Sequence, residues 1–153
     1  MAEHKCVNII LIETSTSLCS VALSQDGVIK SYRESAQTKA HASLTAPFVK
    51  EVLDECGLSI RECDAVCVSS GPGSYTGLRV GVSTAKGLCF GAGIPLLAVS
   101  TMDVLAEMGK NIECRFIVPM IDARRMEVYS AVYANSPAGR PHQILSLIHI
   151  SEP

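Results

Sequence analysis

The glycine-rich segment at residues 66–91 constrains the fold of this chain more than any other feature. It reads VCVSSGPGSYTGLRVGVSTAKGLCFG. The apolar run 66–68 is long enough for a buried strand, and turn residues interrupt it at 69–73. Thr76 can cap a following helix through its hydroxyl. Apolar residues then recur at helical spacing, at Leu78, Val82, Ala85 and Cys89. The segment predicts a strand, a tight turn and a helix whose first N–H groups face an anion or another backbone.

Two familiar phosphate-binding loops do not match this turn. A P-loop has Lys and then Ser or Thr directly after its last glycine, whereas Leu78 and Arg79 follow Gly77. A dinucleotide-binding loop counted from Gly71 has glycine at the position where Thr76 stands. A plain strand-to-helix turn explains the pattern as well as a ligand loop does.

The predicted helix carries more glycine than a helix tolerates cheaply. Gly77, Gly81, Gly87 and Gly91 lie in or beside it, and an interior glycine costs about 1 kcal/mol relative to alanine. Gly77 and Gly81 are four residues apart and therefore share one face. That face predicts close approach of another element, either inside the fold or on a partner.

Composition places the chain among globular proteins. It has 153 residues, 48% hydrophobic and 18% charged, with a net charge of -2. Without a basic face, direct gripping of nucleic acid is disfavoured. The seven cysteines include no CxxC pair, which favours reduced thiols in a cytoplasmic protein, with Cys63 and Cys67 as core or strand residues. No apolar run is long enough for a membrane span.

The rest of the chain predicts a mixed sheet with helices on its faces. Ser43 is expected to cap the first helix, which contains Pro47, and Ser59 with Glu62 resembles a capping box. Ser100 with Asp103 opens the last helix. The expected strands are 6–12, 20–24, 28–33, 66–68, 94–99, 115–121 and 126–134, and the expected helices are 44–56, 78–90 and 101–108. The stretch 142–150 is apolar enough to add one more strand.

Two hairpins echo each other at an offset of 109 residues. Ile12-Glu13 matches Ile121-Asp122, and a second strand follows each acid. Glu13 and Asp122 are therefore candidate catalytic acids facing across a cleft, or each caps its own turn through local hydrogen bonds. The echo predicts two related subdomains, 1–110 and 111–135, followed by an atypical tail at 136–153. We expect the second subdomain to be truncated.

These segments resemble the TsaB (YeaZ) family, described as bacterial dimerisation subunits of tRNA threonylcarbamoyladenosine biosynthesis and, in older usage, as M22 peptidase homologues. The resemblance rests on residues 12–17 (IETSTS), 69–81 (SSGPGSYTGLRVG) and 121–124 (IDAR). It implies an α/β fold of the actin/Hsp70-like (ASKHA, RNase H-like) class, with a complete first half.

The resemblance also implies a function without catalysis. A family member is expected to support the catalytic paralogue TsaD and the ATPase TsaE and to reach tRNA only through the complex, and a homodimer is left open. No catalytic residue, metal or cofactor is expected, and ATP or ADP at a subunit junction is left open. Where TsaD carries two metal-binding histidines four residues apart, Thr45 follows His41 here. The alternative is an ATP-dependent phosphotransferase or metalloprotease-like enzyme of the same fold.

The first two long helices are the expected partner interface. Apolar stripes supply burial at such a contact, and small residues permit close approach. The predicted interface residues are Leu44, Phe48, Val52, Gly77, Gly81 and Ala85.

Overall fold

The computed structural model describes residues 6–37, 41–135 and 139–151, with the side chains of 146–151 left out. The chain forms two compact units. Unit 1 contains residues 1–70 and 74–98, and unit 2 contains residues 71–73 and 99–153.

Unit 1 is built on a five-stranded mixed sheet with the order β3-β2-β1-β4-β5. Strands β1, β2 and β3 form an antiparallel meander, and β4 pairs parallel to β1. The Asp26-Gly27 hairpin turn that the sequence predicts lies between β2 and β3. The strands are β1 (Asn8–Glu13), β2 (Cys19–Gln25), β3 (Val28–Ser35), β4 (Ala65–Ser69) and β5 (Leu96–Val99).

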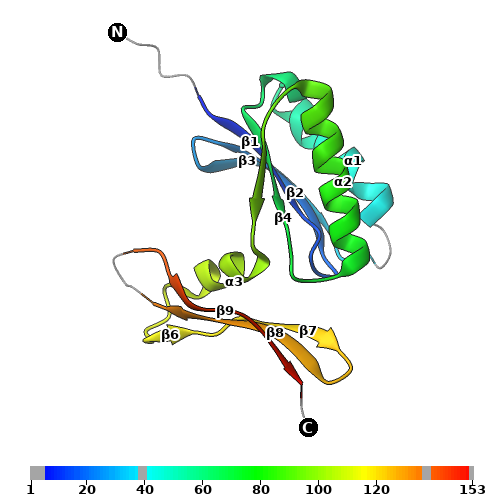
Figure 1. The fold of residues 1–153 in the computed structure, drawn as a ribbon. Coiled ribbons are helices and arrows are strands. Elements are labelled where there is room, and N and C mark those ends of the chain that lie inside the picture. Colours follow the sequence, from blue (N-terminus) through cyan, green and yellow to red (C-terminus); the bar gives the residue numbers. More distant parts are fainter. Residues whose placement is uncertain (1–5, 38–40, 136–138, 152–153) are drawn as a thin grey trace. The chain divides into compact units, whose positions relative to one another are not determined.

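Two helices cover one face of this sheet (Figure 1). They are α1 (His41–Glu55) and α2 (Tyr75–Ala92), and a short turn, η1 (Ile60–Glu62), precedes β4. The fold class expected from the sequence has helices on both faces of the sheet. Both crossovers run the same way along the sheet, from β3 to β4 and from β4 to β5, and right-handed crossovers in one direction lie on one side. Val52 and Ala85 meet Ile10 and Val66 in the resulting core.

Helix α1 begins earlier than the sequence predicts. It starts at His41, so Ser43 lies inside the helix and is not its cap, and Pro47 falls in the second turn. The expected pairing at η1 is confirmed, because the Glu62 carboxylate accepts the Ser59 N–H at 2.7 Å and its hydroxyl at 2.8 Å. These two bonds lower the pKa of Glu62.

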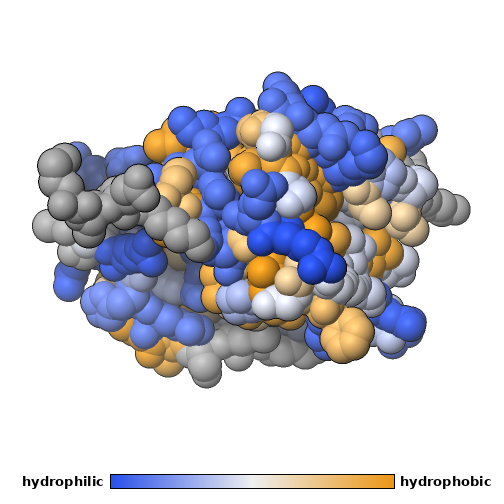
Figure 2. All heavy atoms as spheres, turned by 90° about the horizontal axis from the view of Figure 1, so that it is seen from above, coloured by the Kyte–Doolittle hydropathy of each residue, from blue (hydrophilic) through white to orange (hydrophobic). Residues whose placement is uncertain are grey.

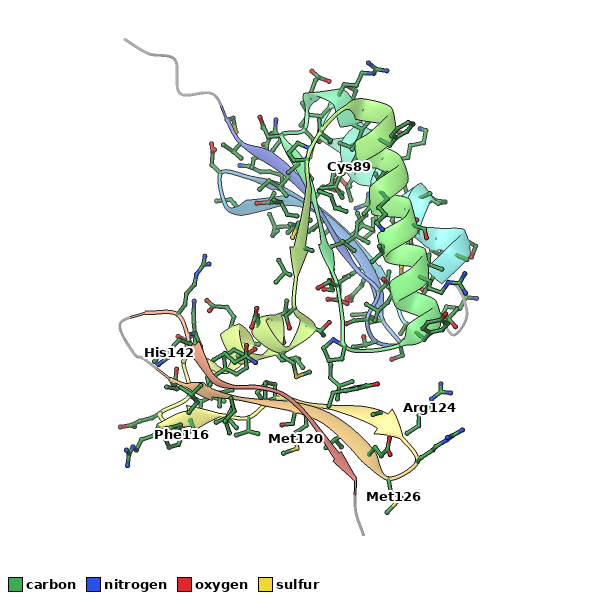
Figure 3. All side chains as sticks on the ribbon, viewed as in Figure 1. Cys89, Phe116, Met120, Arg124, Met126 and His142 are labelled. Carbon is green, nitrogen blue, oxygen red and sulfur yellow. The ribbon has the colours of Figure 1, made fainter. Side chains whose placement is uncertain are left out.

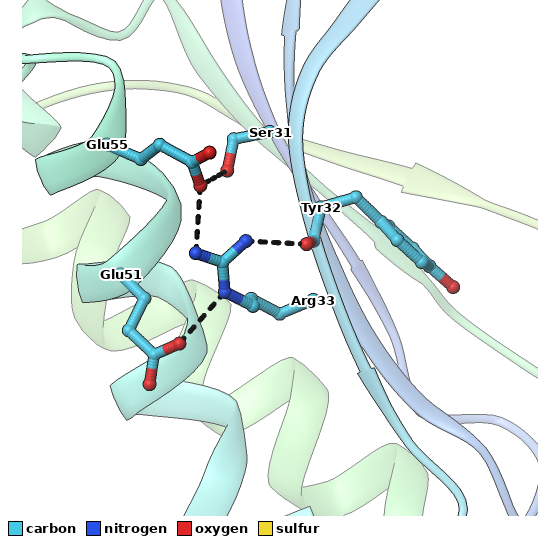
Figure 4. Close-up of polar contacts among 5 residues, drawn as sticks. All are labelled: Ser31, Tyr32, Arg33, Glu51 and Glu55. Carbon is cyan, nitrogen blue, oxygen red and sulfur yellow. Dashed lines mark hydrogen bonds and ion pairs between the residues drawn. The ribbon is translucent and has the colours of Figure 1, made fainter.

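A polar network ties α1 to the edge strand β3 (Figure 4). Arg33 Nε lies 3.0 Å from Glu51 Oε2, and Arg33 Nη2 lies 2.8 Å from Glu55 Oε2. Ser31 Oγ donates to the same Glu55 oxygen at 2.7 Å. The Ser31 bond and then the Arg33 charge lower the pKa of Glu55. The network holds the helix across the sheet edge, where the apolar core ends.

Unit 2 packs one helix on a second antiparallel sheet. Helix α3 (Thr101–Gly109) begins with Ser100, whose hydroxyl accepts the Met102 N–H, as the sequence predicts. The sheet has the order β6-β8-β7, and β9 pairs with β8. The strands are β6 (Phe116–Ile117), β7 (Met120–Arg124), β8 (Glu127–Ala134) and β9 (His142–Ser151).

Two details of unit 2 differ from expectation. The predicted strand 115–121 is split into β6 and β7 at Pro119, which has no N–H to give to a ladder. Helix α3, which the sequence predicts to belong to subdomain 1–110, packs in unit 2, where Met102 and Ala106 contact Ala131 and Tyr133. The subdomain boundary at residue 110 and the atypical tail stay predictions.

A partly buried hydrogen bond joins α3 to β8. Tyr133 is 2% exposed, and its hydroxyl donates to Asp103 Oδ1 at 2.5 Å. Burial and then the Asp103 carboxylate raise the pKa of Tyr133 above its usual value of 10.0. The neutral phenol therefore contributes stability that is fully present below about pH 10 and is lost as the pH rises further.

We predict that Tyr133→Phe destabilises unit 2 by about 1 kcal/mol at neutral pH, because it removes one hydrogen bond. The variant should also lose less stability than the wild type between pH 9 and pH 11. Hydrogen exchange of β8 amides at several pH values measures both effects. Tyr75→Phe, at a side chain that is 74% exposed in unit 1, is the control. Identical alkaline sensitivity in wild type and Tyr133→Phe would contradict the assignment.

Candidate functional site

The glycine face of α2 packs against the turn that follows β1. A Cβ on Gly77 would lie 2.1 Å from the Thr14 carbonyl oxygen, and one on Gly81 would lie 2.2 Å from Thr14 Oγ1. Real Cβ atoms do not approach other atoms so closely. Thr14 itself is fully buried. Positions 77 and 81 therefore require glycine because another element approaches closely, as the sequence predicts. That element is the turn containing Thr14, which belongs to the same unit.

Hydrogen bonds fix the polar turn at 13–17 from several sides. The Glu13 carboxylate accepts the Ser15 N–H at 2.6 Å and also accepts the Ser69 hydroxyl. Ser74 N–H, at the start of α2, donates to the Ser15 carbonyl at 2.6 Å. His41 Nε2 lies 3.1 Å from the Thr16 carbonyl. Strands β1 and β4 and the two helices thus all anchor this one turn.

The second candidate acid has the same local role. Asp122 Oδ1 accepts the Arg124 N–H at 2.7 Å, two residues on, just as Glu13 accepts from Ser15. The reading in which each acid caps its own turn is therefore confirmed. The two acids lie in different units, and each carboxylate accepts the backbone N–H two residues on.

Most of the predicted interface residues lie inside unit 1, which corrects the sequence analysis. Val52, Gly77, Gly81 and Ala85 are buried in its core. Leu44 and Phe48 are half-buried on α1. The error has a physical cause: a glycine pair signals close approach but does not say what approaches, and here Thr14 does. Figure 3 shows the same inward direction for Cys89, which points from α2 toward the sheet.

The cap of α2 and the exposed residues of this helix differ from what the sequence predicts. Ser74, not Thr76, is the cap, because its hydroxyl accepts the Gly77 N–H at 3.3 Å. Phe90 is 93% exposed, and nothing lies within 4 Å of a Cβ on its neighbours Gly87 and Gly91. Arg79 stacks over Tyr75, with its guanidinium carbon 5.5 Å from the ring centre. Helical spacing puts Phe90 on the side of α2 away from Gly77 and Gly81. That spacing is the sequence signal that could have identified this exposed surface.

The described residues offer no cluster of side chains with the composition of a metal site. No group of three His, Cys, Asp or Glu side chains among them could hold a metal ion. Burial raises the pKa of the Cys63 thiol to about 11 and also raises that of Cys67. Both thiols therefore stay protonated at neutral pH. None of the described helices is long and apolar enough to cross a bilayer.

A hollow of about 650 Å³ lies between the end of α3 and β6 in unit 2. Asn135 borders it and donates through Nδ2 to the Lys110 and Ile112 carbonyls at 3.2 and 3.0 Å. These bonds hold the connection from α3 to β6 in place. None of the residues predicted from sequence lies here.

Comparison with known proteins places the chain. A model of the family described as "TsaD: tRNA N6-adenosine threonylcarbamoyltransferase" matches residues 18–139. The tRNA threonylcarbamoyladenosine biosynthesis protein TsaB of Escherichia coli K12 is 37% identical over 138 residues, which are 89% of this chain and 59% of that protein. YeaZ from Pseudomonas aeruginosa superimposes with a TM-score of 0.84 at 31% identity, covering 94% of this chain and 67% of that one. The chain belongs to the TsaB/YeaZ family.

The family assignment carries the fold with it. TsaB of Bacillus subtilis is 34% identical over 83% of this chain and 55% of its own length. EutJ from Carboxydothermus hydrogenoformans, at 12% identity and a TM-score of 0.54, shares the fold alone. These likenesses and the mixed sheet of unit 1 show an actin/Hsp70-like α/β fold. The chain spans between half and two thirds of the length of these curated relatives.

We predict that Gly81→Ala destabilises unit 1 by about 2 kcal/mol through overpacking against Thr14. Adding Thr14→Ala should restore most of this loss, because it removes Oγ1 and leaves only Cβ, 3.3 Å from the new methyl group. Gly87→Ala is the matched control. With open space around it, the added methyl should stabilise the helix by about 1 kcal/mol.

Denaturant unfolding of the wild type, Gly81→Ala, Thr14→Ala and the double variant forms a double-mutant cycle, and Gly87→Ala is measured beside it. If Thr14→Ala failed to rescue Gly81→Ala, the contact between Thr14 and the glycine face would not be what requires glycine.

Proposed function

We propose that this chain is a non-catalytic scaffold subunit in the formation of N6-threonylcarbamoyladenosine on tRNA. It would support a TsaD-type catalytic paralogue in the cytoplasm, together with the ATPase TsaE. The proposal starts from the family, whose curated members carry that biosynthesis in their names. A homodimer is a further state to test.

One observation carries the scaffold role: Phe90 is 93% exposed on the outer face of α2. Gly87 and Gly91, on either side of it, leave room for a second helix to approach the backbone. Large exposed aromatic residues flanked by small ones are typical anchors of protein interfaces. Figure 2, a view from above, shows apolar residues exposed among polar ones on the face in view.

The positive charge of α2 indicates which kind of partner surface would complement it. Helix α2 carries Arg79 and Lys86 and no acidic residue over its eighteen positions. A partner helix with an apolar stripe and flanking carboxylates would complement it. Leu44 and Phe48, half-buried on α1, would extend the contact. The interface therefore keeps the two helices expected from the sequence but uses the side of α2 opposite to Gly77 and Gly81.

The state of the candidate catalytic residues supports a role without catalysis. The Glu13 carboxylate is committed to Ser15 and Ser69. Thr45 stands where a second metal-binding histidine would be needed, and its hydroxyl donates to the His41 carbonyl at 2.6 Å. With a net charge of -2, the chain would reach tRNA through the complex rather than by itself.

We predict that Phe90→Asp lowers the affinity for purified TsaD at least tenfold, because it places a charge at the centre of the contact. Circular dichroism should be unchanged, since Phe90 contributes nothing to the core. Met108→Asp, at a residue that is 76% exposed in unit 2, is the control and should bind normally. Calorimetric titration measures the three affinities. Equal affinity of Phe90→Asp and wild type would remove α2 from the interface.

The absence of catalysis is tested separately. Purified chain alone should form no threonylcarbamoyladenosine and hydrolyse neither ATP nor peptide above background, with Mg²⁺, Zn²⁺ or Fe²⁺ present. Adding it to TsaD and TsaE, with tRNA and an activated threonylcarbamoyl donor supplied, should raise product formation. Turnover by the chain alone that disappears in Glu13→Ala would identify an enzyme and contradict the scaffold role.

A further inference from the structure

The hairpin turn between β7 and β8 has a backbone that its side chains do not favour. Arg124, Arg125 and Met126 have φ angles of 68°, 55° and 64°. Arg124 pairs with Glu127, so Arg125 and Met126 form a two-residue loop. Two-residue loops with positive φ at both positions strongly prefer Asn-Gly or Asp-Gly, since residues with a bulky side chain rarely adopt this region. Three such residues in a row make an outlier.

The same chain contains a well-built turn of this kind for comparison. Between β2 and β3, Asp26 and Gly27 have φ angles of 50° and 80°. Asp-Gly is a preferred pair for such a loop, so reversal of the chain is enough to explain these residues. The β7–β8 turn has Arg-Arg-Met, although Asn-Gly or Asp-Gly at its two loop positions would fit the same backbone with less strain. Local rules broken in this way mark functional sites.

The side chains of this turn are free to meet a partner. Figure 3 shows Arg124 and Met126 at the end of the hairpin. Met126 is 72% exposed, and both arginines are exposed. Among the described residues, no carboxylate lies within ion-pair distance of either guanidinium. The nearby Asp122 carboxylate accepts the Arg124 backbone N–H.

We propose that Arg124, Arg125 and Met126, here called the Arg–Met turn, are a docking contact for an acidic protein surface with an apolar recess. The partner is the TsaD-type paralogue, so this inference rests on the proposed function. Arginine and methionine are both enriched at protein interfaces, and a guanidinium pairs with carboxylates in a fixed geometry. An exposed methionine and a net charge of -2 favour protein over RNA phosphate as the occupant.

The decisive variant rebuilds the turn with the residues its backbone prefers, Arg125→Asn with Met126→Gly. It should raise the midpoint of thermal unfolding of unit 2 by about 3 °C and lower the affinity for purified TsaD about tenfold. Stability and binding thus move in opposite directions, which a purely structural turn would not do. Arg61→Asn, at an exposed arginine of η1, controls for the loss of one positive charge and should bind normally.

A second variant separates charge from backbone geometry. Arg124→Glu with Arg125→Glu keeps bulky side chains in the turn, so the unfolding midpoint should not rise, yet the affinity for TsaD should fall at least as far. Raising the salt concentration should weaken binding of the wild type more than that of either variant.

The outcomes distinguish this inference from the proposed function. If wild-type chain does not bind TsaD, the proposed function fails. If it binds and the Asn-Gly variant is more stable with unchanged affinity, only the Arg–Met turn proposal fails. The proposal is also overturned if the Asn-Gly variant loses affinity for purified tRNA while keeping its affinity for TsaD, or if that variant is less stable than the wild type.

Discussion

The contact between Thr14 and the glycine face of α2 holds unit 1 together. Gly77 and Gly81 let the helix backbone reach the turn that follows β1, and a methyl group at either position would collide with Thr14. The same turn receives hydrogen bonds from Ser69 and from the N-terminus of α2. Because the buried face of α2 is committed to this contact, only its opposite face remains for a partner. The proposed interface follows from that constraint.

Much of this fold is readable from the sequence because its signals are local. Apolar runs locate the strands of unit 1 to within one or two residues, and Asp26-Gly27 gives the hairpin. The capping residues Ser100 and Ser59 are found in the same way. The pairing of each candidate acid with its own turn also follows, since an acid and an N–H two residues on lie together in many turns.

Local sequence signals do not predict which element or protein packs against a given surface. Gly77 and Gly81 show that something approaches, but only the three-dimensional packing shows that it is Thr14. The direction of the two crossovers, which places α1 and α2 on one face, depends on the strand order of the whole sheet. The positive φ angles at the Arg–Met turn are equally hidden, because arginine and methionine do not ordinarily indicate them. Sequence reasoning therefore locates elements better than it locates surfaces.

The central claim is that the outer face of α2 binds a TsaD-type partner while its glycine face stays inside unit 1. Side-chain oxidation by hydroxyl radicals, read by mass spectrometry with and without purified TsaD, tests it most directly. The account predicts that TsaD slows oxidation of Phe90 and Tyr75, both strongly exposed in the free chain, and leaves Met108 unchanged. A stable complex in which Phe90 and Tyr75 react as fast as in the free chain would contradict it.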